Sequence, residues 1–321
     1  MLIAAIFLLL WIVGLPPSDL TPPVDSMKNP VEPFRLQEHV RKLSEEFVPR
    51  DSEHRENLLQ TAKYIQDALQ PYAAKVAFQC YGVNGRQYVN VIAEYGPATN
   101  NILVVGAHYD AFSVYPGADD NASGVAGLIE LGRLLKQLNL RCRVELVAYS
   151  LEEPPFFASQ YMGSAVHAHR VKKAGKTVEL MIALEMIGYF TEKNDSQKYI
   201  VPLLHISHPS EGNFIAIIDR IFSKKAQEIA SAVNRFTSLP AYAITAPAAV
   251  PGIDFSDHRN YWANGFPAVM VTDTAFYRNP FYHSPNDTMD TLNYEKMADV
   301  IYGIFKYIEE NYTTPIHQQE N

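Results

Sequence analysis

Three apolar segments that end in polar residues constrain the fold of this chain more than any other feature. The segments ILVVGAHYD (102–110), CRVELVAYSLEE (142–153) and VELMIALEMIGY (178–189) are nearly continuous hydrophobic runs before their polar ends. The amphipathic stretch ASGVAGLIELGRLLKQL (122–138) separates the first two and predicts a helix. Apolar strands alternating with helices are typical of a parallel sheet covered on both faces. The sequence therefore predicts an α/β fold, a single three-layer domain with a mixed, largely parallel sheet and helices on both faces.

Further periodic segments extend this predicted domain over residues 31–315, followed by a tail at 316–321. Apolar residues three and four positions apart indicate helices, and short apolar runs rich in β-branched and aromatic residues indicate strands. The additional helices are expected at 33–47, 56–69 and 294–310, and the additional strands at 75–83, 88–96 and 265–274.

An uncharged apolar run from Leu2 to Leu15 begins the chain. It is short for a membrane span and has the length of a signal-peptide core. No Lys or Arg precedes it and no clear small-x-small motif follows, so a cleaved signal peptide and an uncleaved anchor both remain open. The Pro-rich linker behind it disfavours a third interpretation, a buried element of the domain. We expect residues 1–30 to direct export to the periplasm or extracellular space, with membrane association if the run is retained.

Charge and cysteine content exclude some classes of function. The formal net charge is −8 and no basic block is present, which argues against a nucleic-acid partner. Cys80 and Cys142 are too few for a disulfide framework or a thiolate zinc site. Whether they pair stays open at this stage, and two buried thiols are the expectation.

Acidic and histidine side chains gather where the predicted strands end. His108 and Asp110 end the first apolar segment, Glu152 and Glu153 end the second, and Glu185 lies near the end of the third. In open α/β sheets, ligands bind beyond the carboxyl ends of the strands. We therefore expect these side chains to converge at one edge of the sheet.

Asp119 and Asp120 stand side by side in YPGADDNASG (115–124). Adjacent like charges repel each other. A divalent metal ion would resolve this repulsion because it becomes the largest local charge. Mixed His and carboxylate ligands suit zinc, with manganese or cobalt as further options. The two carboxylate oxygens of Asp120 can bridge two metal ions, whereas Asp119 is expected to point elsewhere, toward solvent or a backbone donor.

Five ordered motifs resemble the co-catalytic zinc aminopeptidases of metallopeptidase family twenty-eight. They are GAHYDAFSVYPGADDNASG, SLEE, LEMIGY, SDHRNYWANGFPA and YHSPNDT, and the resemblance covers about residues 85 to 312. It implies a zinc-dependent exopeptidase that hydrolyses the N-terminal peptide bond of peptides with a free N-terminus. It also implies two zinc ions per chain, bridged by the attacking water.

The resemblance assigns roles to individual residues. Asp120 looks like the ligand that bridges both ions, Glu153 and His283 like the other ligands of one zinc, and His108 and Glu185 like those of the second.

Three further residues match family positions that act around the metal ions. Glu152 is similar to the general base, which takes a proton from the water and passes it to the leaving amine. Tyr282 matches a tyrosine that hydrogen-bonds the developing oxyanion. Asp110 matches the residue that orients His108.

The chain departs from the family pattern in two places. Glu185 stands where the family usually has Asp, so the second metal is expected to be weaker. The loop EEPPFFASQYMGS is longer than usual, and its Phe156, Phe157 and Tyr161 are expected to line the substrate pocket.

The remaining polar residues lie outside the predicted ligand set. Asp257 and His258 either support the ligands or cap a helix. The remaining histidines considered are expected to be exposed or structural: His167, His169, His205 and His208.

Two other functions share this pattern of residues. A glutaminyl cyclase on the same scaffold usually carries Trp before the last His ligand and lacks the ASG after the bridging acid, whereas this chain has Tyr282 and keeps Ala122, Ser123 and Gly124. A non-catalytic ectodomain would have lost ligands, and no ligand position here holds an inert residue. Each site residue also has a plain structural interpretation, such as an ion-paired strand end for Glu185 or aromatic packing for Tyr282.

Overall fold

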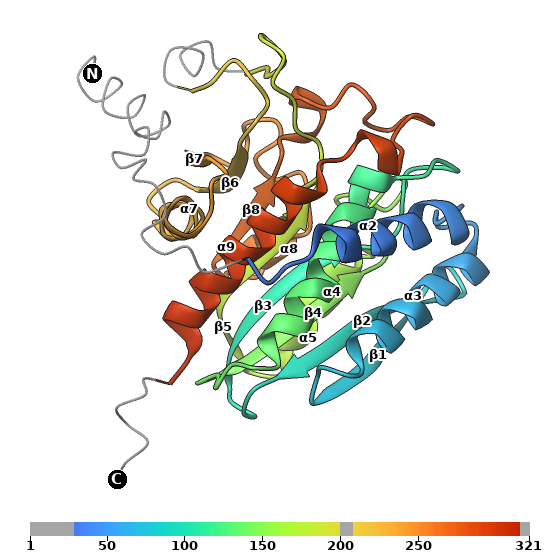
Figure 1. Ribbon diagram of the computed structural model, residues 1–321. Helices are drawn as coiled ribbons and strands as arrows, with labels where there is room; N and C mark the ends of the chain where they lie inside the picture. Colours follow the sequence, from blue (N-terminus) through green and yellow to red (C-terminus); the bar gives the residue numbers. More distant parts are fainter. Residues whose placement is uncertain (1–28, 200–207, 315–321) are drawn as a thin grey trace.

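One mixed sheet forms the centre of the molecule (Figure 1). The computed structural model describes residues 29–199 and 208–314. Within them, an 8-stranded sheet has the order β1-β2-β4-β3-β5-β8-β6-β7. Its strands are β1 (Lys75–Val83), β2 (Arg86–Tyr95), β3 (Asn101–His108), β4 (Arg143–Tyr149), β5 (Thr177–Glu185), β6 (Ile215–Arg220), β7 (Ala241–Ala246) and β8 (Ala268–Thr272). The middle strands β4, β3, β5 and β8 run parallel, whereas β1 and β2 join antiparallel at one side.

Helices cover both faces of the sheet, which completes the three layers. Side chains alternate along β3, so that Leu103 and Val105 enter one core while Ile102 and Val104 enter the other. The helices α2, α4 and α9 cross the first face in front of the sheet in Figure 1, α3 and α7 pack beside them, and α5 and α8 pack together on the opposite face. Their bounds are α2 (Pro33–Arg41), α3 (Arg55–Leu69), α4 (Gly124–Leu135), α5 (Gly163–Lys173), α7 (Lys225–Phe236), α8 (His258–Ala263) and α9 (Tyr294–Tyr312). The predicted α/β fold is therefore confirmed.

The structure adds elements for which the sequence analysis made no prediction. Between residues 190 and 264 it contains β6, α7, β7 and α8, and α5 follows the loop after β4. The strands β6 and β7 have 6 residues each, and the helix α7 has 12.

Two sequence expectations meet different outcomes in this description. Cys80 lies exposed on the edge strand β1, so the expectation of two buried thiols is wrong for this residue. Cys142 is buried, and both thiols are free. The apolar run at residues 2–15 lies outside the described residues, and its role as a signal peptide or anchor stays a prediction. None of the described helices is long and apolar enough to cross a membrane.

The parallel strands deliver polar residues to one edge of the sheet. His108 ends β3 opposite Tyr149 at the end of β4, and Glu185 ends β5 opposite Thr272 at the end of β8. After β3 the chain turns at Gly117, whose φ of 56° lies in the left-handed region that favours glycine. Asp120 follows this turn, before α4.

Gly106 in β3 leaves space for the ring of Tyr149, and this close packing gives a test of the fold. A Cβ atom at residue 106 would lie 2.3 Å from Cε2 of Tyr149. The Tyr149 hydroxyl shares a 2.7 Å hydrogen bond with the Tyr261 hydroxyl, so the ring is not free to move. We expect Gly106→Ala to lower the free energy of unfolding by about 1–3 kcal/mol, the usual cost of overpacking, measured by urea denaturation.

Gly82→Ala is the matched control, because a Cβ there would make an ordinary 3.5 Å contact with Gln87. It should change stability little or raise it slightly. Equal stability of the two variants would contradict the packing argument.

Candidate metal centre

Asp120 lies between two histidines that come from distant parts of the chain. Its Oδ1 is 3.3 Å from Nε2 of His108, and its Oδ2 is 3.2 Å from Nε2 of His283. Nε2 of His108 is also 3.3 Å from Oε2 of Glu185, and Nε2 of His283 is 3.2 Å from Oε2 of Glu153. Two groups of potential metal ligands thus share Asp120, one with His108 and Glu185 and the other with Glu153 and His283.

Unsatisfied polar atoms indicate that these groups fit metal ions. Among the described residues, Nε2 of His108, Nε2 of His283 and Oε1 of Glu153 are buried without a hydrogen-bond partner. Buried polar atoms are normally hydrogen-bonded, so each such atom requires an explanation. Nitrogen and carboxylate oxygen donors in groups of three, facing a common point, match the ligands that zinc takes in proteins. The donor set and the unpartnered atoms together fit zinc.

The electrostatics of the metal-free centre are those of a crowded acidic site. Burial would lower the pKa of His108, but the negative charges of Glu185 and Glu152 raise it well above its usual value. Burial also opposes protonation of His283, yet the carboxylates of Asp120 and Glu153, each 3.2 Å from its Nε2, raise its pKa to about 10. In the absence of metal, the two imidazoles therefore carry protons that balance the carboxylates.

The neighbouring glutamates have raised pKa values for a different reason. Burial, followed by the charge of Asp120, raises the pKa of Glu153 to about 8. Burial also raises the pKa of Glu152 well above its usual value, with the charges of Glu185 and Glu153 adding to the effect. A bound cation reverses this effect because it is the largest charge in the centre.

Asp110 and Asp287 hold the main chain of the ligand-bearing segments. Asp110 accepts hydrogen bonds from the backbone N–H groups of Glu152 and Glu153, at 3.1 and 3.0 Å. Asp287 accepts from the backbone N–H groups of Asp119 and Asp120, at 2.9 and 3.1 Å. These carboxylates fix the position of ligand residues through the main chain.

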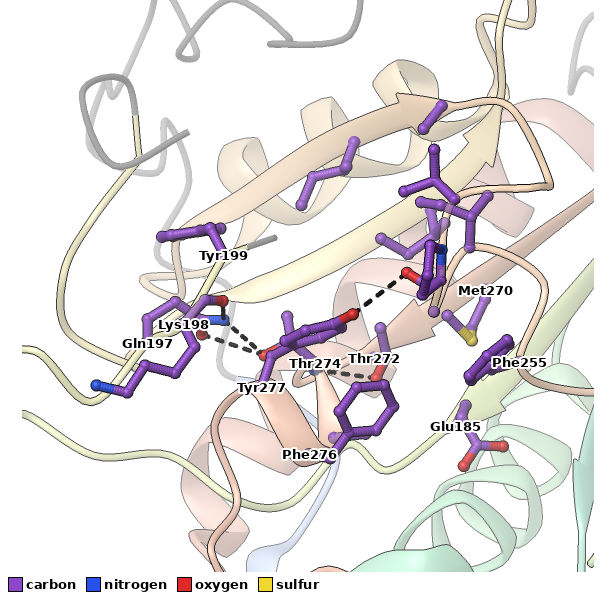
Figure 2. Close-up of a pocket in the computed structure, with 18 of the residues that line it drawn as sticks. Glu185, Gln197, Lys198, Tyr199, Phe255, Met270, Thr272, Thr274, Phe276 and Tyr277 are labelled. Atoms are coloured by element: carbon purple, nitrogen blue, oxygen red, sulfur yellow. Dashed lines mark hydrogen bonds between the residues drawn. The ribbon is translucent and has the colours of Figure 1, made fainter. Parts of the chain in front are cut away.

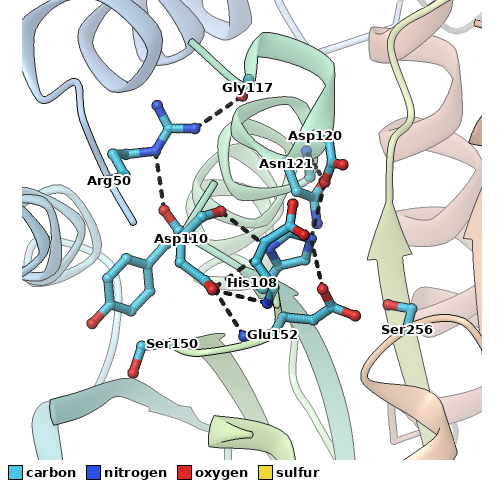
Figure 3. Close-up of polar contacts among 12 residues, drawn as sticks. Arg50, His108, Asp110, Gly117, Asp120, Asn121, Ser150, Glu152 and Ser256 are labelled. Atoms are coloured by element: carbon cyan, nitrogen blue, oxygen red, sulfur yellow. Dashed lines mark hydrogen bonds and ion pairs between the residues drawn. The ribbon is translucent and has the colours of Figure 1, made fainter. Parts of the chain in front are cut away.

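Asp110 also contacts His108, mainly through its main chain. Nδ1 of His108 lies 3.1 Å from the Asp110 carbonyl oxygen and 3.5 Å from its Oδ1 (Figure 3). The position predicted to orient His108 is thus beside that ring.

Arg50 holds the loop between His108 and Asp120 (Figure 3). Its guanidinium donates to the carbonyl oxygens of Tyr109, Pro116 and Gly117 at 3.0, 2.8 and 2.9 Å, and also to that of Leu43. Burial lowers the pKa of Arg50 to about 10, although Asp287 and Asp110 act against this change. The role of Arg50 was not predicted from the sequence, because its partners are main-chain carbonyl oxygens and no sequence motif indicates them.

Two aromatic rings hold the imidazole of His283. Phe112 stacks on it with ring centroids 4.0 Å apart, and Tyr282 stacks with centroids 3.8 Å apart. The φ of His283 is 50°, in the left-handed region, so the backbone there depends on its surroundings. The side chain of Tyr282 is largely buried beside the same acidic residues, whose charges act with burial to raise its pKa.

Asp119 and Glu185 are both held by specific donors. Asp119 is fully buried and accepts hydrogen bonds from the Gly188 backbone N–H at 2.9 Å and from the Asn279 amide at 2.8 Å. Of the two expected directions, the backbone donor is therefore correct and solvent is wrong. The Ser256 hydroxyl donates to Oε2 of Glu185 at 2.7 Å. Ser256 is the first residue of the motif SDHRNYW, and this contact was not predicted.

The long loop after Glu153 contributes less to the substrate side than expected. Phe156 and Tyr161 pack against the main core and neither lines the cavity beside the centre, so their place in a substrate pocket stays a prediction. Phe157 does not line the cavity either, but its ring lies 5.9 Å from that of Phe255, which does. The Phe156 ring lies 6.4 Å from that of Tyr88, which explains its inward position.

The other predicted residues have structural surroundings. Asp257 is buried at the start of α8 without a side-chain cap, and His258 bonds the Ile253 carbonyl through Nε2. His167 is buried and bonds Glu145 and Tyr261, His208 is buried, and His169 is exposed. His205 lies outside the described residues.

The α/β fold and the paired histidine–carboxylate groups define a zinc-type exopeptidase. The sequence pattern of peptidase family M28 matches residues 90–308, and the chain belongs to this family. The chain is 47% identical over 281 residues to the uncharacterized protein YfbL of Escherichia coli, covering 85% of this chain and 86% of YfbL.

Two further proteins are similar to this chain at lower sequence identity. A probable aminopeptidase of Saccharomyces cerevisiae is 29% identical over 67% of this chain, which spans 54% of that protein. The solved structure of BSAP, a zinc aminopeptidase from Bacillus subtilis, matches with a TM-score of 0.70 and 14% identity, covering 90% of this chain and 97% of BSAP. The structural likeness is one of fold.

Metal binding is expected to release protons, because His108 and His283 bind a metal only as neutral imidazoles. Both have raised pKa values in the metal-free centre, so zinc must displace their protons near pH 7. Glu153, whose pKa is raised to about 8, would also lose its proton, so we expect a release of about two or more protons per chain and an apparent affinity that rises with pH. Calorimetric titrations of zinc in buffers of different ionisation enthalpy measure this number.

The exposed His169 provides the control for this titration. His169→Gln should release the same number of protons as the unaltered protein. Zinc binding without proton release would show that the two buried histidines are not the ligands.

Proposed function

We propose that this protein is a zinc-dependent aminopeptidase that removes the N-terminal residue of peptides with a free N-terminus. The observation that carries the proposal is the position of Asp120, whose two oxygens each face a different histidine. Membership of peptidase family M28 supports the peptidase reaction.

Five residues would hold two zinc ions in this proposal. His108, Asp120 and Glu185 would bind one ion, and Asp120, Glu153 and His283 the other. When bound, the ions lower the pKa of an attacking water and polarise the scissile carbonyl. Glu185 is longer than the Asp usual at its position, and we expect its ion to be the weaker of the two.

Glu152 is the proposed general base because it lies beside both ligand groups and belongs to neither. Its Oε2 is 4.0 Å from Nε2 of His108, and its backbone is fixed by Asp110. A carboxylate so placed can accept a proton from the attacking water and deliver it to the departing amine. Nearby cations lower its pKa toward the range in which it accepts a proton.

Tyr282 is the proposed donor to the oxyanion. Its ring is stacked on His283 and lines the cavity next to the centre, so its hydroxyl belongs to the same surroundings as the ligands. A hydrogen bond from this hydroxyl stabilises negative charge that develops on the carbonyl oxygen.

Replacing Glu152 by Gln tests the base. Glutamine keeps the shape and the backbone contacts but accepts no proton, so kcat should fall by about 10²–10⁴-fold while zinc content is retained. Elemental analysis and kcat are measured on the same preparation. Glu192→Gln, at an exposed ion pair with Lys296, is the control and should leave both values unchanged. Normal kcat with normal zinc in Glu152→Gln would remove Glu152 from the mechanism.

The free N-terminus is tested with leucyl, glutamyl and N-acetyl-leucyl chromogenic amides. A free ammonium can bind carboxylates such as Glu152 and Glu185, whereas an acetyl group removes this donor and leaves a buried acid without a partner. That loss costs roughly 1–3 kcal/mol, or more for a charged group, which is about a 5- to 150-fold loss in kcat/KM. Equal cleavage of the acetylated compound would contradict an aminopeptidase. Conversion of N-terminal glutamine to pyroglutamate without peptide cleavage would indicate a glutaminyl cyclase instead.

A further inference from the structure

A cavity of about 170 Å³ lies directly beside the candidate metal centre (Figure 2). Glu185 and Tyr282 line it, and both also belong to the centre. The strands β6, β7 and β8 contribute Ile218, Ile244 and Met270 to its walls. A group held at the centre can therefore extend a side chain into this cavity.

The walls of the cavity favour an apolar occupant. Apart from Glu185, Lys198 is the one charged residue among the described lining residues, and its ammonium donates to the Asp195 carbonyl at 2.9 Å. The amide of Gln197 donates to the Thr274 hydroxyl and its oxygen accepts from Arg278. These groups are engaged by neighbours and most of the other walls are apolar, so burying a charged side chain against them would cost its hydration.

Tyr277 closes one side of this cavity. Its carbonyl accepts a 2.8 Å hydrogen bond from the Lys198 backbone N–H, and its hydroxyl donates to the Pro251 carbonyl at 3.3 Å. Its main chain is therefore tied to the segment at 197–199 and its side chain reaches the loop at 250–253, as the dashed lines in Figure 2 show. The ring also covers Gly252, where a Cβ would lie 3.0 Å from Cε2 of Tyr277. Tyr277 lines the cavity and is only partly buried, so its side chain contacts both the cavity and solvent.

We propose that Tyr277 is a specificity-determining residue that sets the largest N-terminal side chain the enzyme accepts, an inference that rests on the aminopeptidase function proposed above. Dry apolar cavities of about 150 Å³ hold benzene. The volume here thus admits a branched aliphatic or single-ring aromatic side chain. A longer side chain, such as a biphenyl group, meets the Tyr277 ring.

The test compares leucyl, phenylalanyl and 4-biphenylalanyl chromogenic amides on the zinc-loaded enzyme. Tyr277→Ala removes the wall, so the ratio of kcat/KM for the biphenylalanyl over the leucyl substrate should rise by at least about tenfold, the scale of size discrimination in apolar pockets. Tyr277→Phe keeps the ring over Gly252 and should leave the ratio within about threefold. Phe34→Ala is the control, because Phe34 is an exposed aromatic residue on α2, outside the cavity.

The variant Tyr277→Leu and a binding measurement test the same wall independently of substrate cleavage. Tyr277→Leu retains apolar packing with a shorter side chain and should shift the ratio in the same direction as Tyr277→Ala. Calorimetry measures binding of 3-methylbutylamine and 2-(4-biphenylyl)ethylamine, which carry the amine and the side chain without a scissile bond. The Ala and Leu variants should gain affinity for the biphenyl amine relative to the smaller amine, by a similar factor.

Two outcomes separate this proposal from the function on which it rests. If the unaltered enzyme cleaves leucyl amide but both variants keep the original substrate and amine preferences, Tyr277 is not the wall and only this inference fails. If no substrate is cleaved, the aminopeptidase function fails, and unchanged amine preferences in the variants would then also overturn the role of Tyr277.

Discussion

The rest of the site depends on the sharing of Asp120 between two imidazoles. His108 comes from the end of β3 and His283 from a loop more than a hundred residues later, yet both Nε2 atoms lie within 3.3 Å of Asp120. Charges this close in a buried site are tolerated only if they are paired or bind a cation. The metal-free protein pairs them through protons on the histidines, and zinc would replace those protons. In the proposed function, the same carboxylate would serve as the ion-pair partner in the metal-free state and as the shared ligand in the zinc-bound state.

Carboxylates that bind no metal make this arrangement stable. Asp110 and Asp287 each accept two backbone N–H groups from ligand-bearing segments, and such bonds between charged acceptors and the backbone are stronger than neutral ones. Arg50 adds a buried positive charge that binds only carbonyl oxygens of the described chain. Its charge is thus available to offset the acids while its hydrogen bonds fix the loop before Asp120. Removing any of these groups would leave buried polar partners unsatisfied.

The sequence was sufficient to predict the convergence of the ligands but not their support. Parallel strands end at one edge, so the polar ends of β3 and β5 had to place His108 and Glu185 together. Arg50 was not predictable, because its partners are carbonyl groups whose position follows from the tertiary fold. The packing of Phe156 against the core was not predictable, since an aromatic residue in a loop has the same sequence pattern whether it faces a pocket or the core. The elements between residues 190 and 264 were missed, although α7 has buried apolar residues three and four positions apart, so the sequence of this segment was open to prediction.

The cavity and the metal centre meet at Glu185. The centre is acidic and the cavity is apolar, and this difference would orient the first residue of a peptide. The centre offers carboxylates to an ammonium group, whereas the cavity offers apolar walls to a side chain. Both groups are attached to the same Cα atom, so satisfying both leaves few orientations for the carbonyl group that follows. Holding a reacting group in one orientation supplies a large part of catalysis, because the loss of freedom precedes the chemical step. In the proposed function, the wall at Tyr277 therefore affects the reaction as well as binding, since a side chain that cannot enter fully also displaces its carbonyl from the centre.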